Sequence, residues 1–395
     1  MTSRSTGSSE SLTDQRTLDA LTRRERDDLR QVLVATVASD GGVGSAARVQ
    51  DLVARVPMDA LAPAAAVHRL SGSVLRGLDG IDDVPAPVIE HLAAVRQRSS
   101  FHHLLVTGML GRIGEEFDRA GIAWVVMKGP VVAALLYPEP ADRSYGDLDL
   151  LVGRRDFSVA MNILEQLGFE HRVRNWALAE RMLAGQVGMR NPEVDVDLHW
   201  HVHYSHQDRQ PFGLDPEAMI ARRRRADVSG VEIPALDPVD TLLTLAFHAA
   251  RSDGHRLIWL KDIERSLAVE TPDLEVLVER ARTQRCAPPV GIMLDRARAV
   301  LGAEVPGGVV RELVPGPLRS VERTATSLVD PVQFHQRDTL TRMFTRSVRS
   351  STWETLSSVP PRGARMLHRR LFPAVSNETD DPDERASYLS AVADS

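Results

Sequence analysis

Hydrophobic positions along the chain change their spacing twice, and these changes divide it into three regions. From residue 16 to about residue 118, apolar side chains recur every three to four positions, which is typical of helices with one buried face. Residues 88–117 read as one long helix or as two stacked helices. Near Gly121 the spacing shortens to strand-like runs, and from Pro238 the helical spacing returns and continues, more weakly, to about residue 371.

The middle region reads as an alternation of strands and helices. The continuous apolar run at residues 122–127 predicts a buried strand, and Pro130 suits the first turn of a helix because its missing N–H is not needed there. The further elements that we expect are a helix at 131–136, a strand at 147–152, a helix at 156–167, a strand at 169–173, and a strand pair at 187–189 and 193–204 that turns at Asn191-Pro192. We therefore expect an α/β core with a mixed sheet, flanked by N-terminal and C-terminal helical regions.

The two ends of the sequence are polar. The first residues are rich in Ser and Thr, and the last twenty include a run of acidic residues, so both ends are typical of disordered tails. The organisation that we expect is a disordered tail at 1–15, a helical N-terminal region at 16–118, the α/β core at 119–235, a helical C-terminal region at 236–375 and an acidic disordered tail at 376–395.

Composition narrows the class of protein. The 395 residues carry a formal net charge of −6, which argues against a generic nucleic-acid binder, since such proteins usually have a basic excess. The single cysteine, Cys286, leaves no internal disulfide and no cysteine-based zinc site. No apolar run approaches the roughly 20 residues that a membrane span needs, and the first residues lack the apolar core of a secretory signal. We expect a cytoplasmic protein with no membrane association.

A pair of carboxylates in the second expected strand is the first candidate for chemistry. Asp147 and Asp149 are two positions apart, so on a strand both point to the same face, opposite the apolar Leu148 and Leu150. Two adjacent carboxylates repel each other unless a cation lies between them, and Mg²⁺ prefers such oxygen ligands. A solvent-facing strand edge would give the same short pattern, so the flanking sequence has to decide.

The segment before this pair could hold phosphate groups. Lys128-Gly129 follows the first strand, where a glycine turn lets a phosphate approach the backbone and a lysine supplies a cation. Arg143 and Ser144 lie in the loop just before the Asp pair. Each of these residues also has an ordinary interpretation, as a turn, a solvated lysine, or an arginine paired with a neighbouring aspartate.

The segment after the pair carries a polar strand face made only of Asp and His. The polar positions alternate with apolar ones and are Asp195, Asp197, His199, His201 and His203. Such a face could place a third carboxylate beside the first two. It could also form a zinc site from the three histidines, or be exposed surface.

These three segments together resemble a known superfamily. The run Met127-Lys128-Gly129, then Tyr137-Pro138, Arg143, and Asp147-Leu148-Asp149 before further apolar residues is similar to nucleotidyltransferases of the polymerase-beta type. More narrowly, with the later Asp197-Leu198-His199-Trp200, it resembles an uncharacterised bacterial nucleotidyltransferase family. The resemblance is strongest between about residues 124 and 200.

The resemblance implies an NTP-dependent, two-metal mechanism on a nucleotidyltransferase fold. Asp147, Asp149 and Asp197 would bind two Mg²⁺ or Mn²⁺ ions, with Asp195 as the competitor of Asp197 for the third position. Lys128 and Gly129, with Arg143 and Ser144, would lie at the triphosphate, and the third carboxylate could help to deprotonate an acceptor. The superfamily turn is usually Gly-Gly or Gly-Ser, whereas this chain has Gly129-Pro130, which removes one N–H from the phosphate cradle. His199, His248 and Asp262 are second-tier candidates near the cleft.

The reaction expected is transfer of a nucleoside monophosphate, with AMP as one candidate, to a hydroxyl or phosphate of an acceptor. The acceptor could be a small molecule, a peptide, a protein or an RNA, and the net acidity favours a small molecule or peptide. One alternative is a zinc-dependent hydrolase that uses His199, His201 and His203; another is a non-catalytic nucleotide-binding or scaffold relative. The basic run at residues 222–225 could contact RNA, but it is more typical of a solvated helix face.

Overall fold

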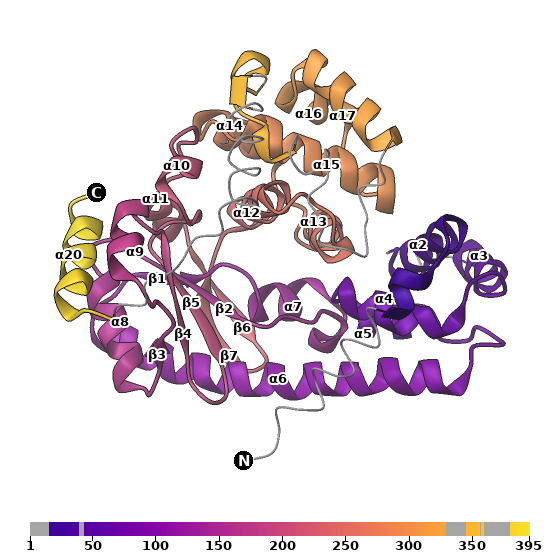
Figure 1. Ribbon diagram of the computed structural model, residues 1–395, viewed down its shortest axis with the longest axis horizontal. Helices are drawn as coiled ribbons and strands as arrows, with labels where there is room; N and C mark the ends of the chain where they lie inside the picture. The colour runs from indigo at the N-terminus through magenta and orange to yellow at the C-terminus, as the bar shows by residue number, and fades with distance from the viewer. Residues whose placement is uncertain (1–15, 39–42, 329–344, 356, 359–379) are drawn as a thin grey trace.

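The computed structural model describes residues 16–38, 43–328, 345–355, 357–358 and 380–395, so the expected tail at 1–15 lies outside the described residues. The N-terminal region is helical, as expected (Figure 1). Its elements are α2 (Arg23–Val37), α3 (Val43–Val53), η1 (Met58–Ala60), α4 (Leu61–Val67), α5 (Ser71–Gly77) and α6 (Ala86–Arg119).

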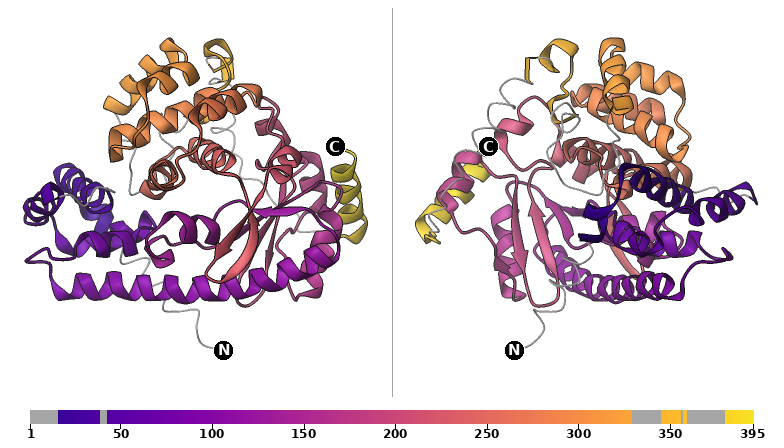
Figure 2. Two further views of the ribbon diagram at one scale, coloured as in Figure 1. Left: turned by 180° about the vertical axis from the view of Figure 1, so that it is seen from behind. Right: turned by 45° about the vertical axis from the view of Figure 1, so that its right-hand side comes forward.

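Helix α6 is one continuous helix of 34 residues, which at the usual rise per residue makes it about 50 Å long. It contacts α4 and α5 in the N-terminal region and also β7 and α8 in the core. Figures 1 and 2 show it running along the sheet and on beneath the N-terminal helices. The N-terminal region and the core therefore share one long helix.

The core is built on a seven-stranded mixed sheet with the order β3-β4-β5-β2-β1-β7-β6. The pairs β2–β5 and β1–β7 are parallel, and the other four pairs are antiparallel. The strands are β1 (Trp124–Val126), β2 (Leu148–Val152), β3 (Glu170–His171), β4 (Gln186–Arg190), β5 (Asp195–His199), β6 (Arg224–Val228) and β7 (Val231–Ala235). The other elements of this region are α7 (Pro130–Leu136), η2 (Pro140–Asp142), α8 (Phe157–Gln166), α9 (Trp176–Met182), α10 (His206–Arg209) and α11 (Pro216–Ala221).

The C-terminal region is again helical, which confirms the predicted fold class of an α/β core with a mixed sheet and two flanking helical regions. Its elements are α12 (Pro238–Arg251), α13 (Leu257–Glu270), α14 (Leu274–Thr283), α15 (Ala287–Leu301), α16 (Gly307–Leu313) and α17 (Gly316–Leu328). None of the helices in the described parts of the chain is long and apolar enough to cross a membrane.

The alternation of side chains along β2 assigns the two faces of the sheet to different neighbours. Leu148 and Leu150 pack into a cluster with apolar residues of α6 and α8. Leu151 packs on the opposite side, in a cluster that includes the apolar face of α12 and α13. Asp149 points to the same face as Leu151, because strand side chains alternate. The acidic face of β2 is therefore directed toward α12.

Two segments differ from the expectations. The arginine run was expected to lie on a helix face or to contact RNA, but Arg224 and Arg225 lie on β6, which forms a hairpin with β7 through the left-handed Ser229-Gly230 turn. The strand expected at 193–204 is shorter, since β5 ends at His199.

The end of the chain was expected to be disordered between residues 376 and 395, yet it contains helix α20 (Pro382–Ala393). Asp381 caps this helix, and Tyr388 is buried and donates a 2.7 Å hydrogen bond from its hydroxyl to the carbonyl oxygen of Ala184. Acidic composition had suggested disorder, but buried Tyr388 and Val392 give the segment an apolar face that packs against α9.

Candidate metal and nucleotide site

Asp149 and Asp197 lie side by side because their strands are parallel neighbours in register. Asp149 is the partner of Asp197 in the β2–β5 pairing, and Leu151 is the partner of His199. The potential ligand atoms of Asp149, Asp197 and His199 all lie within 4.8 Å of one another. Two carboxylate oxygens and an imidazole nitrogen at such spacing form a set that could hold a divalent cation.

The carboxylate of Asp149 is almost completely buried, with 1% of the residue exposed. Its Oδ1 lies 3.1 Å from Nε2 of His199 and 3.3 Å from Nζ of Lys128. Burial alone would raise the pKa of Asp149, but the charge of Lys128 and the contact with His199 outweigh it, so the pKa lies well below its usual range. The carboxylate is thus ionised.

The second oxygen of this carboxylate, Oδ2 of Asp149, is buried without a hydrogen-bond partner. Leaving a buried anionic oxygen unsatisfied is costly, so such an atom calls for an explanation. A divalent cation bound beside Asp197 would supply the missing interaction. The residues present therefore fit a metal ion.

Asp197 is partly buried, and its Oδ2 accepts a 2.9 Å hydrogen bond from Nε2 of Gln186. Burial raises the pKa of Asp197, and the negative charges of Asp149 and Asp147 raise it further, against an opposing effect of His199. Burial is thus the main cause of the raised pKa, and the neighbouring acids add to it, so a cation bound beside Asp197 would favour its ionised form.

Asp147 and Asp195 lie outside this set. Asp147 immediately precedes β2 and is half-buried, and its carboxylate does not belong to the group of close ligand atoms. Asp195 instead pairs with Arg190 at 2.6 Å and with Arg172 at 3.6 Å. Of the two carboxylates that competed for the third position, Asp197 is the one beside Asp149.

The histidine row does not extend along one strand. Because β5 ends at His199, His201 and His203 lie in the following bends, where Nδ1 of His201 accepts a hydrogen bond from the backbone N–H of His203. Nε2 of His203 accepts a hydrogen bond from Arg251. Within the described ranges, His199 is the only one of these histidines in a group that could bind a metal ion, so the three-histidine zinc site considered as an alternative is absent from them.

Gly129 makes a turn that other residues could not adopt without strain. Its φ is +69°, and a Cβ placed there would lie 3.0 Å from the carbonyl oxygen of Asp147. Pro130 follows as the first residue of α7. The turn at Gly129 therefore packs directly against the backbone of Asp147.

Arg143 was expected at the phosphates, but it is buried in a pair with Asp262. Its Nε and Nη2 each donate a 2.8 Å hydrogen bond to one oxygen of Asp262, and the hydroxyl of Tyr137 donates to the same carboxylate at 2.8 Å. Arg143 is 6% exposed and Asp262 1%. The two segments that carry these residues pack together, and the resulting ion pair neutralises both charges.

Ser144, the other residue expected at the phosphates, is held on both sides. Its Oγ lies 2.8 Å from Oγ of Ser99 on α6, and its backbone N–H donates to the carbonyl oxygen of Arg69.

His248 is half-buried, with its ring edge-on to Trp259 at 5.8 Å, and it faces the carboxylates from α12. Burial, followed by the charge of Lys128, lowers the pKa of His248 well below its usual value, so the ring is neutral.

Two arginines that the sequence analysis did not single out face the same space. Arg69 and Arg256 are close enough for the charge of Arg69, after burial, to lower the pKa of Arg256. No carboxylate of the described residues forms an ion pair with either, and Nε of Arg256 is buried without a partner. Arg69 also has a positive φ of 58°, a strained conformation that is often found at functional sites. Each is an isolated arginine in the sequence, and only the fold brings them together.

Two cavities meet at the carboxylates, one of about 230 Å³ on the side of the arginines and one of about 250 Å³ on the side of Asp197. Their shared wall consists of Lys128, Asp147, Asp149, Leu245 and His248. We call them the arginine cavity and the apolar cavity. The arginine cavity is further lined by Arg69, Gly129, Arg143, Ser144, Tyr145, Ser252, Arg256, Ile258, Trp259 and Asp262.

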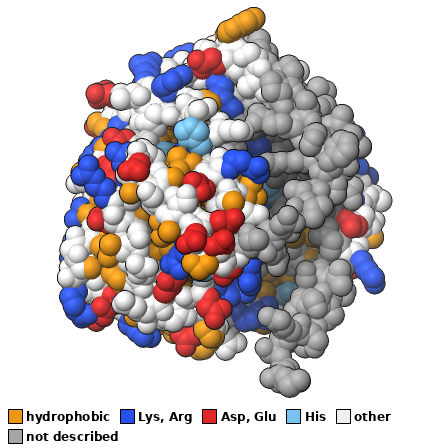
Figure 3. Space-filling view, turned by 60° about the vertical axis from the view of Figure 1, so that its left-hand side comes forward, with side chains coloured by type: hydrophobic (Ala, Val, Ile, Leu, Met, Phe, Trp, Pro, Cys, Tyr) orange, Lys and Arg blue, Asp and Glu red, His pale blue; other side chains and the backbone are white. Residues whose placement is uncertain are grey.

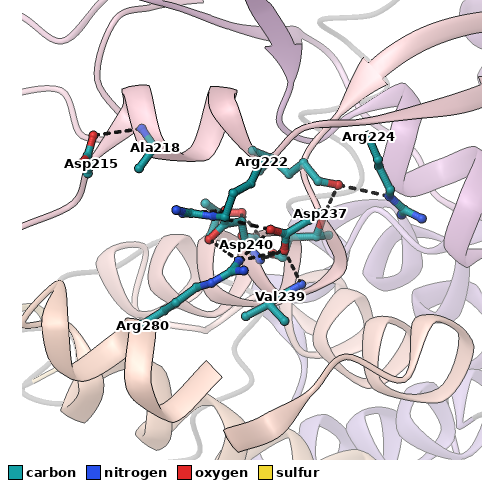
Figure 4. Close-up of polar contacts among 11 residues, drawn as sticks. Asp215, Ala218, Arg222, Arg224, Asp237, Val239, Asp240 and Arg280 are labelled. Carbon is teal, nitrogen blue, oxygen red and sulfur yellow. Dashed lines mark hydrogen bonds and ion pairs between the residues drawn. The ribbon is translucent and has the colours of Figure 1, made fainter. Parts of the chain in front are cut away.

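The basic run at residues 222–225 does not reach either cavity. Figure 4 shows Arg222, from the end of α11, and Arg280, from α14, pointing toward Asp237 and Asp240. Arg224 pairs with Glu270. These contacts tie the hairpin β6–β7 and its flanking segments to the C-terminal helices, so Arg222 and Arg224 have a structural role, whereas Arg223 and Arg225 are exposed.

The chain was compared with curated proteins, solved structures and protein families. None of the curated proteins compared matches the chain. Among solved structures, the chain is similar to an antigenic nucleotidyltransferase-like protein from Paracoccidioides brasiliensis, with 14% identity, a TM-score of 0.32, and coverage of 52% of this chain and 95% of the other. It is also similar to a tRNA nucleotidyltransferase complexed with a primer tRNA and an incoming ATP analogue, with 11% identity, a TM-score of 0.21, and coverage of 71% and 94%.

These structural likenesses are remote and say nothing about the substrate. The sequence itself matches a family described as uncharacterised nucleotidyltransferases over residues 55–302, which is more than half of the chain. That range contains both cavities and every residue of their walls. The chain belongs to this uncharacterised nucleotidyltransferase family.

Proposed function

We propose that the protein transfers a nucleoside monophosphate from an NTP to an acceptor hydroxyl at the carboxylates of β2 and β5, and that it needs a divalent metal ion, Mg²⁺ or Mn²⁺, to do so. The observation that carries this proposal is the buried, unpartnered Oδ2 of Asp149 beside Asp197 and His199. A metal ion bound there would neutralise charge on the phosphates and on the attacking oxygen. Asp149 and Asp197 would hold it, with His199 and Asp147 as the nearest further donors.

The arginine cavity fits the triphosphate. Arg69 and Arg256 carry positive charge without a carboxylate partner among the described residues, and Lys128, which contacts Asp149, lines the same cavity. A polyanion would relieve the mutual repulsion of the two arginines and make charge-assisted hydrogen bonds with them. Arg143 does not contribute in this way, since its charge is already paired with Asp262.

The reaction balances without further reagents. The acceptor hydroxyl oxygen forms a bond to the α-phosphorus as the bond from that phosphorus to the bridging oxygen of the pyrophosphate breaks. The hydroxyl proton passes to the carboxylate of Asp197 and then to solvent. The products are an acceptor–NMP ester and pyrophosphate, and Arg69 and Arg256 would hold the departing pyrophosphate.

The test is to incubate the protein with each α-labelled NTP, Mg²⁺ or Mn²⁺, and three kinds of acceptor: alcohols, peptides and a short RNA. We expect label transfer that is lost in Asp149→Asn and in Asp197→Asn. Asp195→Asn is the matched control, because it removes the same charge from the same strand at a residue that is paired outside the site. Transfer that survives Asp149→Asn, or that is lost equally in Asp195→Asn, would contradict the proposed site.

Binding gives a second readout that does not depend on the acceptor. Titration calorimetry with MgATP should show at least about ten-fold weaker binding for Arg69→Met or Arg256→Met, because each loses a charge-assisted contact of roughly 1.5–3 kcal/mol. Unchanged affinity in both variants would contradict binding of the triphosphate in the arginine cavity.

A further inference from the structure

We propose that the apolar cavity binds the acceptor, and that the acceptor is an uncharged alcohol with a largely apolar body. This inference rests on the proposed function. It adds the chemical class of the second substrate, which the family match leaves open.

The position of the cavity supports an acceptor role. In an in-line displacement the attacking oxygen and the leaving oxygen lie on opposite sides of the phosphorus. If the pyrophosphate lies with Arg69 and Arg256, the acceptor approaches from the other side of the carboxylates. That side is the apolar cavity, where Asp197 and His199 form one wall and α12 forms the other.

The lining of the cavity favours an apolar body. Beyond the shared wall, five of the nine lining side chains are hydrophobic, and three of the four polar ones, Gln186, Asp197 and His199, lie together at the carboxylates, whereas Thr244 bonds to the backbone of its own helix. The apolar members are Met127, Val202, Leu214, Leu243 and Phe247, and the polar ones are Gln186, Asp197, His199 and Thr244. A molecule with a hydroxyl at one end and an apolar remainder matches this gradient, because few precisely placed polar groups among apolar ones orient a ligand.

The charges of the lining favour a neutral acceptor. Among the described residues that line the cavity, the only charged ones are Lys128, whose ammonium already pairs with Asp149, and the three aspartates of the proposed metal site. A polycationic acceptor would need acids that are not bound to metal, and a nucleic acid would need cations for its phosphates. The surface shown in Figure 3 also has acidic and basic side chains intermixed, which does not suit a nucleic acid.

The size of the cavity limits the buried part of the acceptor. An apolar protein cavity of about 150 Å³ is large enough for benzene. The cavity here has about 250 Å³, which suits a fused two-ring system or a branched chain of similar volume. We therefore choose 2-(2-naphthyl)ethanol as the probe, and the same ring system with an added carboxylate or an added ammonium group as charged comparators.

The experiment first measures binding of the three probes to the full chain by ligand-observed NMR, without nucleotide. With Mg²⁺ present at saturation, we expect the neutral alcohol to bind at least about ten-fold more tightly than either charged comparator. The aspartates are then engaged by the metal and Lys128 pairs with Asp149, so the cavity offers no free counter-charge. Val202→Phe, which fills the cavity from a half-buried position, should weaken binding of the alcohol at least ten-fold. Thr244→Leu, at another residue of the cavity lining, should also weaken binding of the alcohol. Val159→Phe, on the exposed side of α8, is the control and should leave binding unchanged.

The outcomes separate the two proposals. Absence of binding at millimolar alcohol, equal binding of the charged comparators, or no effect of Val202→Phe and Thr244→Leu overturns the acceptor class. Label transfer from α-labelled ATP to a polycationic amino sugar or to RNA, but to no neutral alcohol, overturns it as well, while it leaves the proposed function intact. Failure of MgATP to bind, with no transfer to any acceptor, overturns the proposed function and with it the role of the cavity.

Discussion

Replacement of Arg143 with methionine distinguishes a structural arginine from a phosphate ligand. The guanidinium makes two 2.8 Å hydrogen bonds to Asp262, and both side chains are almost fully buried. Methionine keeps most of the apolar stem but leaves the Asp262 carboxylate with only the hydroxyl of Tyr137 as its partner in this network. Breaking a buried ion pair in this way costs about 3–5 kcal/mol, because an uncompensated charge remains.

For a folded region of about 150–250 residues, each kcal/mol lost from the free energy of unfolding lowers the melting temperature by about 2–4 °C. The expected fall for Arg143→Met is therefore on the order of 10 °C. The double variant Arg143→Met/Asp262→Asn removes the stranded charge, and we expect it to recover a large part of the loss. Differential scanning fluorimetry and calorimetry on the four proteins of this cycle measure the coupling between the two residues.

Binding of MgATP to the same variants completes the test. At 20 °C, Arg143→Met should bind MgATP within about three-fold of the parent, whereas Arg69→Met should bind at least about ten-fold more weakly with an unchanged melting temperature. The reasoning is refuted if Arg143→Met melts like the parent and loses nucleotide affinity, since Arg143 would then act at the phosphates and not on Asp262.

Three further changes test other parts of the site and fold. Mg²⁺ at about a hundred times its Kd should raise the melting temperature of the parent by about 5–11 °C and leave Asp149→Asn unchanged in a thermal melt, and an equal rise in both would exclude Asp149 as a ligand. Gly129→Ala should lower the melting temperature by about 2–10 °C, because its φ of +69° is unfavourable for alanine, whereas Gly146→Ala, which meets no atom within 4 Å, should have little effect; similar melts for both would contradict the strain. Burial, then the charges of His255 and Arg256, lower the pKa of His68 to about 3, so its contribution to stability is complete above pH 6.5 and falls by about 1.4 kcal/mol per pH unit below it. The free energy of unfolding in urea should therefore fall less between pH 7 and pH 5 for His68→Asn than for the parent, and an equal fall in both proteins would contradict a neutral His68.

The features that could be predicted from the sequence are those with a local physical cause. The placement of Asp149 on a strand with its carboxylate opposite Leu148 and Leu150 follows from the two-residue period of a strand. The helical conformation of residues 88–117 follows from the spacing of their apolar residues, and the structure decides between the two alternatives in favour of one helix, Ala86–Arg119. The strand pair that turns at Asn191-Pro192 follows from its alternation and from the turn residues between the strands.

The features that could not be predicted depend on partners far apart in the chain. Arg143 and Asp262 are 119 positions apart, and nothing near either residue indicates which charge it will meet. The hairpin β6–β7 had a local signal, the Ser229-Gly230 turn between alternating residues, but the run of arginines beside it favoured an exposed helix. Helix α20 was not predicted because the acidic residues at its start and before it favoured disorder, whereas its stability comes from packing Tyr388 against α9 and Ala184.

The distribution of charge explains how an acidic chain with net charge −6 can hold a triphosphate. Most arginines near the core are paired with carboxylates, as Arg143 is with Asp262 and Arg222 with Asp240, so they add no net field. Arg69 and Arg256 differ, because the described residues give them no such partner, and they line the same cavity as Asp149, whose Oδ2 is unpartnered. A bound metal–triphosphate would supply negative charge to the arginines and positive charge to the carboxylates, so each half of the ligand balances one half of the site. The affinity for MgATP should therefore depend on these few residues and not on the overall charge. When MgATP binding is measured over a range of salt concentrations, reversing a charge on the surface should change the affinity far less than Arg69→Met does.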